Sequence, residues 1–192
     1  MFAAVPKTPA IWKPLLRPLQ RLRSNQSGGA AVEFGFVAAP FIALLIAMVQ
    51  SAIVFLAGRE LDEVVALSSR YILTGQAQTS NMTQAQFATY VCGQTSALFN
   101  CNNFMINVQN YDSFSSANIT TPTLTFNGLG QVNNTWNWSP GGPGSIVVIQ
   151  LMYQWPVVLG PLGFNLANLG NGNRLLVSTA VFKNEPYQNG PN

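Results

Sequence analysis

The charged residue with the least usual surroundings in this sequence is Glu33, which stands at the start of a long apolar segment. Residues 34–57 are 24 positions without one Asp, Glu, Lys or Arg. A carboxylate that enters a membrane carries a large energetic cost, whereas one in the first turn of a helix gains from the helix dipole. Glu33 is therefore either a helix-start residue that reaches back to water or a signal for cleavage and docking.

Two cysteines, Cys92 and Cys101, form the second candidate pair. Both follow the apolar segment, and an isolated pair in an exported domain is typical of a disulfide. Two buried free thiols are the alternative, and a metal site is disfavoured because the sequence has no histidine and no third cysteine. Nine residues of helix would separate the pair by about 13–14 Å, but bridged Cα atoms lie within about 7 Å. A bonded pair therefore requires that the preceding helix end between them.

Catalysis has few candidate residues. The absence of histidine excludes a histidine base or ligand, and after residue 80 the only acids are Asp112 and Glu185. No G-x-S-x-G or S-x-x-K element is present. We therefore expect no enzymatic activity, no metal and no cofactor.

The apolar segment itself is long enough to cross a bilayer, since a spanning helix needs about 20 apolar residues. A buried core helix is the alternative, but core helices of this length rarely lack charges. The positive-inside rule keeps the N-terminus in the cytoplasm and exports the rest, because basic residues precede the segment and no acid precedes Glu33. These basic residues are Lys7, Lys13, Arg17, Arg21 and Arg23.

The charge distribution argues against a nucleic-acid partner. Only 8% of the 192 residues are charged, and the net charge of +3 comes from the N-terminal arm. After residue 80 the four charges cancel, so the folded part lacks the basic surface that nucleic acid requires. They are Asp112, Arg174, Lys183 and Glu185.

The helix continues beyond the apolar segment, because no breaker occurs before Gly75. Its length of about 45 residues corresponds to about 68 Å, with Pro40 expected to introduce a kink. Beyond residue 57, Arg59 and Glu63 are spaced to pair, and five residues share one face that should be buried. That face consists of Leu61, Val64, Val65, Ser68 and Ile72.

The remaining residues predict an α+β domain. Residues 83–98 have helical periodicity, with Phe87, Tyr90, Val91 and Leu98 roughly on one side. Residues 104–109, 121–126, 145–153 and 174–182 are candidate strands. We expect a small antiparallel sheet packed on the exported half of the long helix. Trp136, Trp138 and Trp155 could form an aromatic surface for a ligand or partner. The alternative is that Trp155 lies in the core and the other two cover an edge of the sheet.

Three segments and one spacing carry a resemblance to a known family. The spacing is Gly28, four residues, then Glu33 and Phe34. The segments are A-V-E-F-G-F-V-A-A-P-F, L-D-E-V-V-A-L-S-S-R-Y-I-L-T-G-Q-A-Q and the C-terminal V-S-T-A-V-F-K-N-E-P-Y. The spacing resembles a prepilin leader, and the segments resemble the TadE-like proteins of bacterial tight-adherence (Tad, or Flp-type IVb) pilus systems.

The resemblance implies a minor pilin or pseudopilin in the bacterial inner membrane. A prepilin-type peptidase would cleave between Gly28 and Gly29, and Glu33 and Phe34 would serve assembly. The expected regions are a basic cytoplasmic leader (1–28), a transmembrane helix with its exported extension (29–76) and a periplasmic domain (77–192). Partners would be other pilin subunits, the assembly machinery and membrane lipid. The alternative is a permanently anchored single-pass envelope protein with an exported adhesion or scaffold domain.

Overall fold

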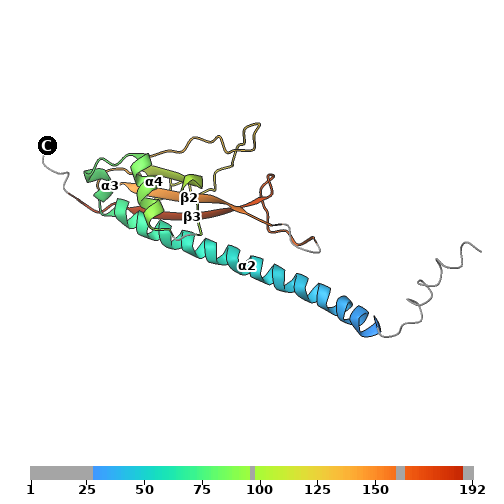
Figure 1. The fold of residues 1–192 in the computed structure, drawn as a ribbon. Coiled ribbons are helices and arrows are strands. Elements are labelled where there is room, and N and C mark those ends of the chain that lie inside the picture. The colour runs from blue at the N-terminus through green and yellow to red at the C-terminus, as the bar shows by residue number, and fades with distance from the viewer. Residues whose placement is uncertain (1–27, 96–97, 159–162, 188–192) are drawn as a thin grey trace, which may run out of the picture. The chain divides into compact units, whose positions relative to one another are not determined.

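The computed structural model describes residues 28–95, 98–158 and 163–187, so the expected leader lies outside the described residues except for Gly28. The chain divides into two units, Met1–Leu45 and Ile46–Asn192. The elements confirm the predicted α+β class (Figure 1). They are α2 (Gly29–Leu73), α3 (Gln76–Thr79), α4 (Gln84–Gly93), η3 (Cys101–Asn103), β1 (Phe104–Tyr111), β2 (Ile146–Pro156) and β3 (Asn173–Lys183).

Helix α2 has the 45 residues that the sequence predicts, and Pro40 lies within it. In the second unit it buries one stripe of its surface, as predicted. Each aliphatic side chain of this stripe stabilises the fold by about 1.5–3 kcal/mol, while intrinsic helix propensities differ by less than about 1 kcal/mol per residue. Packing therefore determines how this half of α2 is placed. The stripe consists of Leu61, Val64, Val65, Ser68 and Ile72, none more than 2% exposed.

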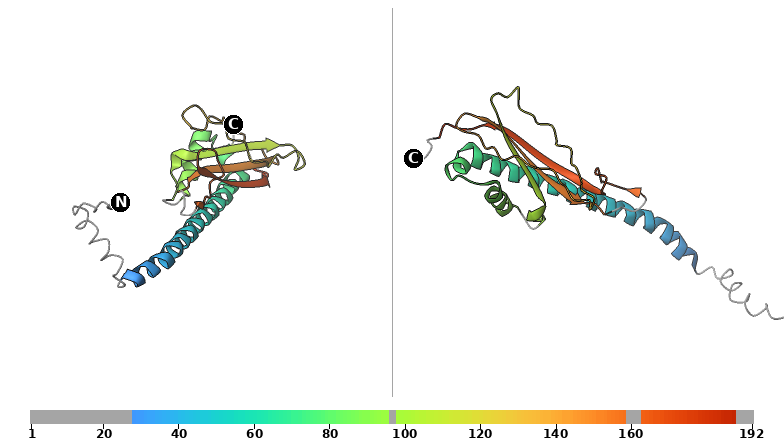
Figure 2. Two further views of the ribbon diagram at one scale, coloured as in Figure 1. Left: turned by 90° about the vertical axis from the view of Figure 1, so that its right-hand side faces the viewer. Right: turned by 90° about the horizontal axis from the view of Figure 1, so that it is seen from above.

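The three strands form one antiparallel sheet in the order β1-β2-β3 (Figure 2). The register places Ile106 opposite Leu151 and Leu151 opposite Ser178. Alternate residues of each strand therefore share a face. One face forms a single core with α2 and α4, because its buried residues and those of the two helices belong to one hydrophobic cluster.

Helix α4 is shorter than predicted and ends at Gly93 instead of residue 98. It starts with a capping box, in which Thr83 and Gln86 satisfy each other's backbone N–H groups. At its end the backbone N–H of Thr95 donates to the carbonyl of Cys92 at 3.1 Å, and the Thr95 hydroxyl donates to the same oxygen at 2.7 Å. The chain then returns toward the sheet, which leaves Leu98 outside the helix and 40% exposed.

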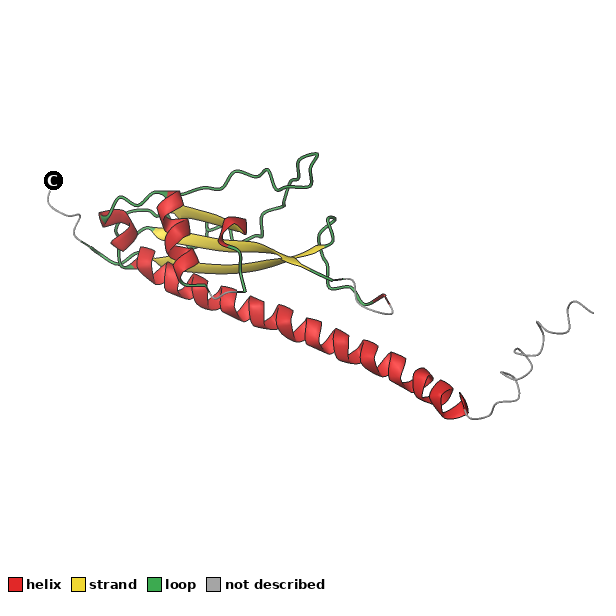
Figure 3. Ribbon diagram, in the orientation of Figure 1, coloured by secondary structure: helices red, strands yellow, loops and turns green. Residues whose placement is uncertain are grey.

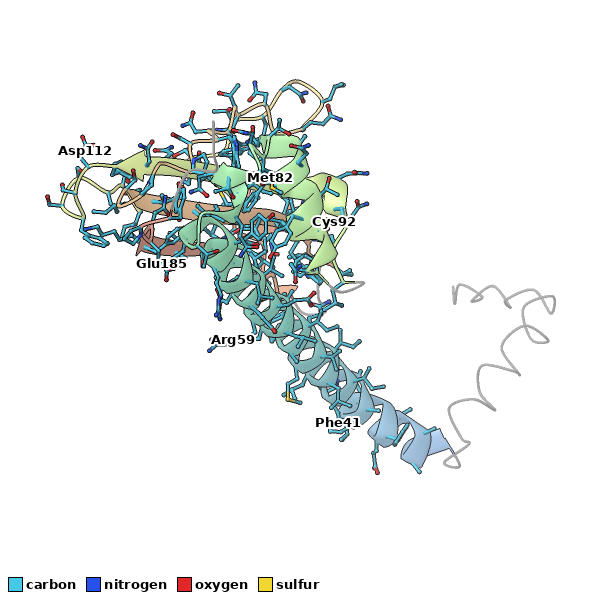
Figure 4. All side chains as sticks on the ribbon, turned by 90° about the vertical axis from the view of Figure 1, so that its left-hand side faces the viewer. Phe41, Arg59, Met82, Cys92, Asp112 and Glu185 are labelled. Carbon is cyan, nitrogen blue, oxygen red and sulfur yellow. A yellow bond between two sulfur atoms is a disulfide. The ribbon has the colours of Figure 1, made fainter. Side chains whose placement is uncertain are left out.

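The predicted disulfide is present between Cys92 of α4 and Cys101 of η3 (Figure 4). The two Cα atoms are 5.4 Å apart, which the early end of α4 makes possible. The bond attaches α4 directly to the start of β1. An aromatic cluster lies nearby, where the Phe99 ring is 4.9 Å from that of Tyr153 and 5.5 Å from that of Phe104.

The strand predicted at residues 121–126 is wrong. This segment lies in the long connection between β1 and β2, where Phe126 and Val132 form only an isolated bridge (Figure 3). Hydrogen bonds from side-chain amides replace those that a neighbouring strand would make. The backbone N–H of Thr125 donates to Asn134 Oδ1 at 2.7 Å, and Asn134 Nδ2 donates to the carbonyl of Thr123 at 2.9 Å. Such local amide bonds compete with regular secondary structure.

We predict that the disulfide stabilises the α+β domain. In the chain-entropy description, a loop this short contributes about 2–3 kcal/mol. The double variant Cys92→Ser, Cys101→Ser should therefore unfold at lower temperature than the oxidised protein. Thiol labelling of the denatured, unreduced protein checks the bond, and two labels per chain would contradict it.

Candidate functional site

The glycines at the start of α2 have an accessible backbone. Gly28 directly precedes the helix and Gly29 is its first residue. A Cβ atom built at either position meets no heavy atom within 4 Å, and both residues are exposed. A peptide bond between two exposed residues without side chains can lie flat in the cleft of a protease.

Glu33 and Phe34 lie in the second turn of α2 and are both exposed. The side chain of Glu33 forms no ion pair or hydrogen bond with any described residue. Phe34 is 73% exposed, and none of the aromatic contacts among the described residues includes it. The two groups are therefore available to a partner outside this part of the chain.

The apolar surface of this part of α2 extends around the whole helix. Val37 and Phe36 are more than 70% exposed, and Phe41, whose side chain is marked in Figure 4, is 60% exposed. The most apolar window has a mean hydropathy of 2.4, and only 17% of it is buried. A helix that is apolar on all sides requires a membrane or other apolar helices around it. By length and composition, α2 can cross a membrane.

The character of the helix changes near Ala57, which is fully buried. Charged residues begin two positions later, where Arg59 Nη1 lies 3.9 Å from Asp62 Oδ2. The predicted pairing of Arg59 with Glu63 is thus replaced by one with Asp62. A contact with the sheet accounts for this change of partner. The hydroxyl of Ser178 in β3 donates a hydrogen bond to Asp62 Oδ1 at 2.7 Å and holds this carboxylate in place. Sequence analysis missed this contact between residues 116 positions apart.

The C-terminal segment after β3 attaches to the end of α2. The backbone N–H of Glu185 donates to the carbonyl of Leu73 at 2.9 Å. Asn184, which is 2% exposed, donates to the carbonyls of Pro140 and Gly142. Figure 4 marks Glu185 beside these elements. The ending V-S-T-A-V-F-K-N-E-P-Y thus contains residues that close the fold.

Tyr187 completes this closure by packing on Gly75. Gly75 has a left-handed backbone with φ of 79°, and a Cβ atom built there would clash with the Tyr187 ring. The Tyr187 hydroxyl donates to the carbonyl of Gly141 at 3.3 Å, and burial raises the pKa of the phenol. Sequence analysis identified Gly75 as a helix stop and did not find its contact with Tyr187, which is 112 residues away in the chain.

We predict that Gly75→Ala destabilises the α+β domain. The left-handed conformation costs a residue with a Cβ atom about 1–2 kcal/mol, and the ring of Tyr187 must also move. A thermal scan should show a midpoint lower by about 2–8 °C. Gly58→Ala is the matched control, since Gly58 lies within α2 and its added Cβ would meet nothing within 4 Å. An equal loss of stability in both variants would contradict the role of the Gly75–Tyr187 contact.

The described residues contain no group of three His, Cys, Asp or Glu side chains that is arranged to hold a metal ion. The chemistry that they do present is the accessible glycine peptide, the exposed carboxylate of Glu33 and the apolar helix surface around it. This arrangement suits proteolysis and helix association.

Comparison with protein families places residues 28–70 within the family model of TadE-like proteins. The match starts at Gly28 and includes Glu33, Phe34 and the buried stripe of α2, except for Ile72. It confirms the resemblance that the sequence motifs indicate over this segment. Neither the curated proteins nor the solved structures include a significant match to the chain. The TadE-like segment suggests a part in Tad pilus assembly.

Proposed function

We propose that this protein is a minor pilin or pseudopilin-like subunit of a Tad pilus system, which assembles through helix–helix contacts in the membrane. The observation that carries the proposal is the coincidence of two features in one segment. The TadE-like match covers the part of α2 that is apolar on all sides and exposed. A helix of this kind gains most when lipid or the helices of other subunits surround it.

The first step in this function is removal of the leader. A prepilin-type peptidase would cleave the accessible bond between Gly28 and Gly29 on the cytoplasmic side of the inner membrane. The five basic residues, which direct membrane insertion, would leave with the leader. The product would begin with the α-amine of Gly29, which is largely protonated near neutral pH. Glu33 would become its fifth residue.

The second step is assembly, in which Glu33 of one subunit pairs with the Gly29 amine of a neighbour. Two unit charges 4 Å apart attract by about 1 kcal/mol in water and about 4 kcal/mol at an effective dielectric constant of 20. The pair is therefore much stronger when apolar helices exclude water. Phe34, directly beside the carboxylate, would supply part of that apolar surface. This accounts for an acid at the start of an apolar helix.

Each region of the chain has its own role in this function. Residues 1–28 are the leader, 29–76 the transmembrane helix with its extension, and 77–192 the exported domain. The Cys92–Cys101 disulfide supports export, because such bonds persist in oxidising compartments such as the periplasm. Besides other subunits, the protein would contact the peptidase, the pilus assembly machinery and membrane lipid.

We predict that Gly28→Leu blocks processing without changing topology, since the basic residues that hold the N-terminus inside remain. Intact mass of the membrane-extracted protein should show the complete precursor for this variant and loss of residues 1–28 for the wild type. Gly35→Leu is the control, because Gly35 is also exposed and its Cβ would meet nothing within 4 Å. An unshortened wild-type protein would favour the permanently anchored envelope protein instead.

We predict that Glu33→Gln leaves cleavage intact and reduces assembly. The substitution keeps the shape of the side chain but removes the charge, so the Gly29 amine of the neighbour loses its carboxylate. Membrane insertion should be unharmed, because a costly charge has been removed. Glu63→Gln, on the exposed surface of the second half of α2, is the matched control.

The assembly readouts are crosslinking between subunits in the membrane and counts of surface pili. Both should fall for Glu33→Gln and stay at the wild-type level for Glu63→Gln. Normal piliation by Glu33→Gln with normal leader removal would show that Glu33 is only a helix-start residue.

A further inference from the structure

A cavity of about 570 Å³ lies in the exported domain, where η3 and the ends of the strands meet residues 131–136 of the long connection. Its volume falls within the range of about 300–1,000 Å³ that is usual for small-molecule sites. It is far in sequence from the membrane helix, and the proposed assembly mechanism makes no use of it.

The polar lining of this cavity consists of carboxamides. A carboxamide both donates and accepts hydrogen bonds, and much of this capacity is unused. The side chains of Asn102 and Asn103 make no hydrogen bond with described residues. The side-chain oxygen of Gln154 accepts hydrogen bonds from Asn171 and Asn173. Its amide N–H groups have no partner among the described residues. The amides that line the cavity are Asn102, Asn103, Gln131, Gln154 and Asn173.

Three of the six apolar residues that line the cavity are aromatic. They are Phe104, Trp136 and Tyr153, and the others are Met105, Val132 and Pro156. Here the structure resolves the two interpretations of the tryptophans. Trp138 and Trp155 pack against the core, and Trp138 Nε1 donates to the carbonyl of Met82 at 2.9 Å. Trp136 is half-buried and outside that core, and its indole N–H has no partner among the described residues. It is thus the one of the three that belongs to the lining of this cavity.

The amide and aromatic residues that line the cavity together favour one class of ligand. Among the described residues that line the cavity, none is charged, so an ionic ligand gains no opposite charge. Carboxamides match a ligand with many hydroxyl groups, each of which donates and accepts. Aromatic rings have a negative face, which attracts the C–H groups on the flat side of a sugar ring. We propose that this cavity binds a neutral carbohydrate, with Trp136 as the stacking residue and Gln154 as a hydrogen-bonding residue.

The test uses the full chain in lipid nanodiscs, because the head groups of glycoside detergents are themselves sugars. Maltotetraose, cellotetraose, mannotetraose and chitotetraose are immobilised, and binding is measured by biolayer interferometry against empty nanodiscs. We expect saturable binding to at least one of the four. Trp136→Ala should weaken it at least about tenfold, which corresponds to about 1.4 kcal/mol.

Matched variants separate recognition from folding. Trp136→Phe should recover part of the affinity because it keeps an aromatic ring, and Gln154→Ala should weaken binding. Phe114→Ala and Asn118→Ala remove an exposed aromatic ring and an exposed amide outside the cavity and should bind as the wild type does. Circular dichroism should be unchanged in all variants that are compared.

Three results would overturn the proposal. The first is no saturable binding to any of the four sugars up to millimolar protein concentrations. The second is binding that Trp136→Ala leaves unchanged. The third is binding only to an anionic sugar such as oligogalacturonate, or only to a peptide, since the cavity would then recognise another class of ligand.

Discussion

The burial of one stripe of α2 against the three-stranded sheet organises the whole α+β part of the chain. A sheet of three strands needs a second layer for its apolar face, and the stripe centred on Leu61, Val64 and Val65 supplies most of it. Helix α4 extends this layer with Phe87 and Val91, both fully buried. Other contacts then secure the layers, namely the disulfide, the bond from Ser178 to Asp62 and the packing of Tyr187 on Gly75.

The part of α2 before Ala57 needs different surroundings from the part that packs against the sheet. There its own chain leaves the apolar surface exposed on all sides, so the free energy that stabilises this part must come from lipid or from other helices. The two halves of α2 are thus suited to different surroundings while their backbone is one continuous helix. The TadE-like match includes both the apolar part of α2 and most of the stripe that packs against the sheet.

The α+β part of the chain relies on amides where many proteins use charges. Asn107 and Gln150 are buried side by side in the sheet and bonded at 3.1 Å, and Gln150 also donates to the carbonyl of Thr120 in the long connection. Further amide bonds at Thr125 hold this connection without a strand. Neutral amides have a lower cost of burial than ions do.

The sequence by itself determined the features that arise from local periodicity and composition. It predicted the extent of α2 and its buried stripe, the strands that became β1, β2 and β3, and the disulfide, because these depend on spacing within one segment. Tertiary structure decided the end of α4 at Gly93, the absence of a strand at residues 121–126 and the partner of Asp62. It also decided that Trp138 enters the core while Trp136 lines a cavity. Such outcomes depend on contacts between residues far apart in the chain, which no local pattern encodes.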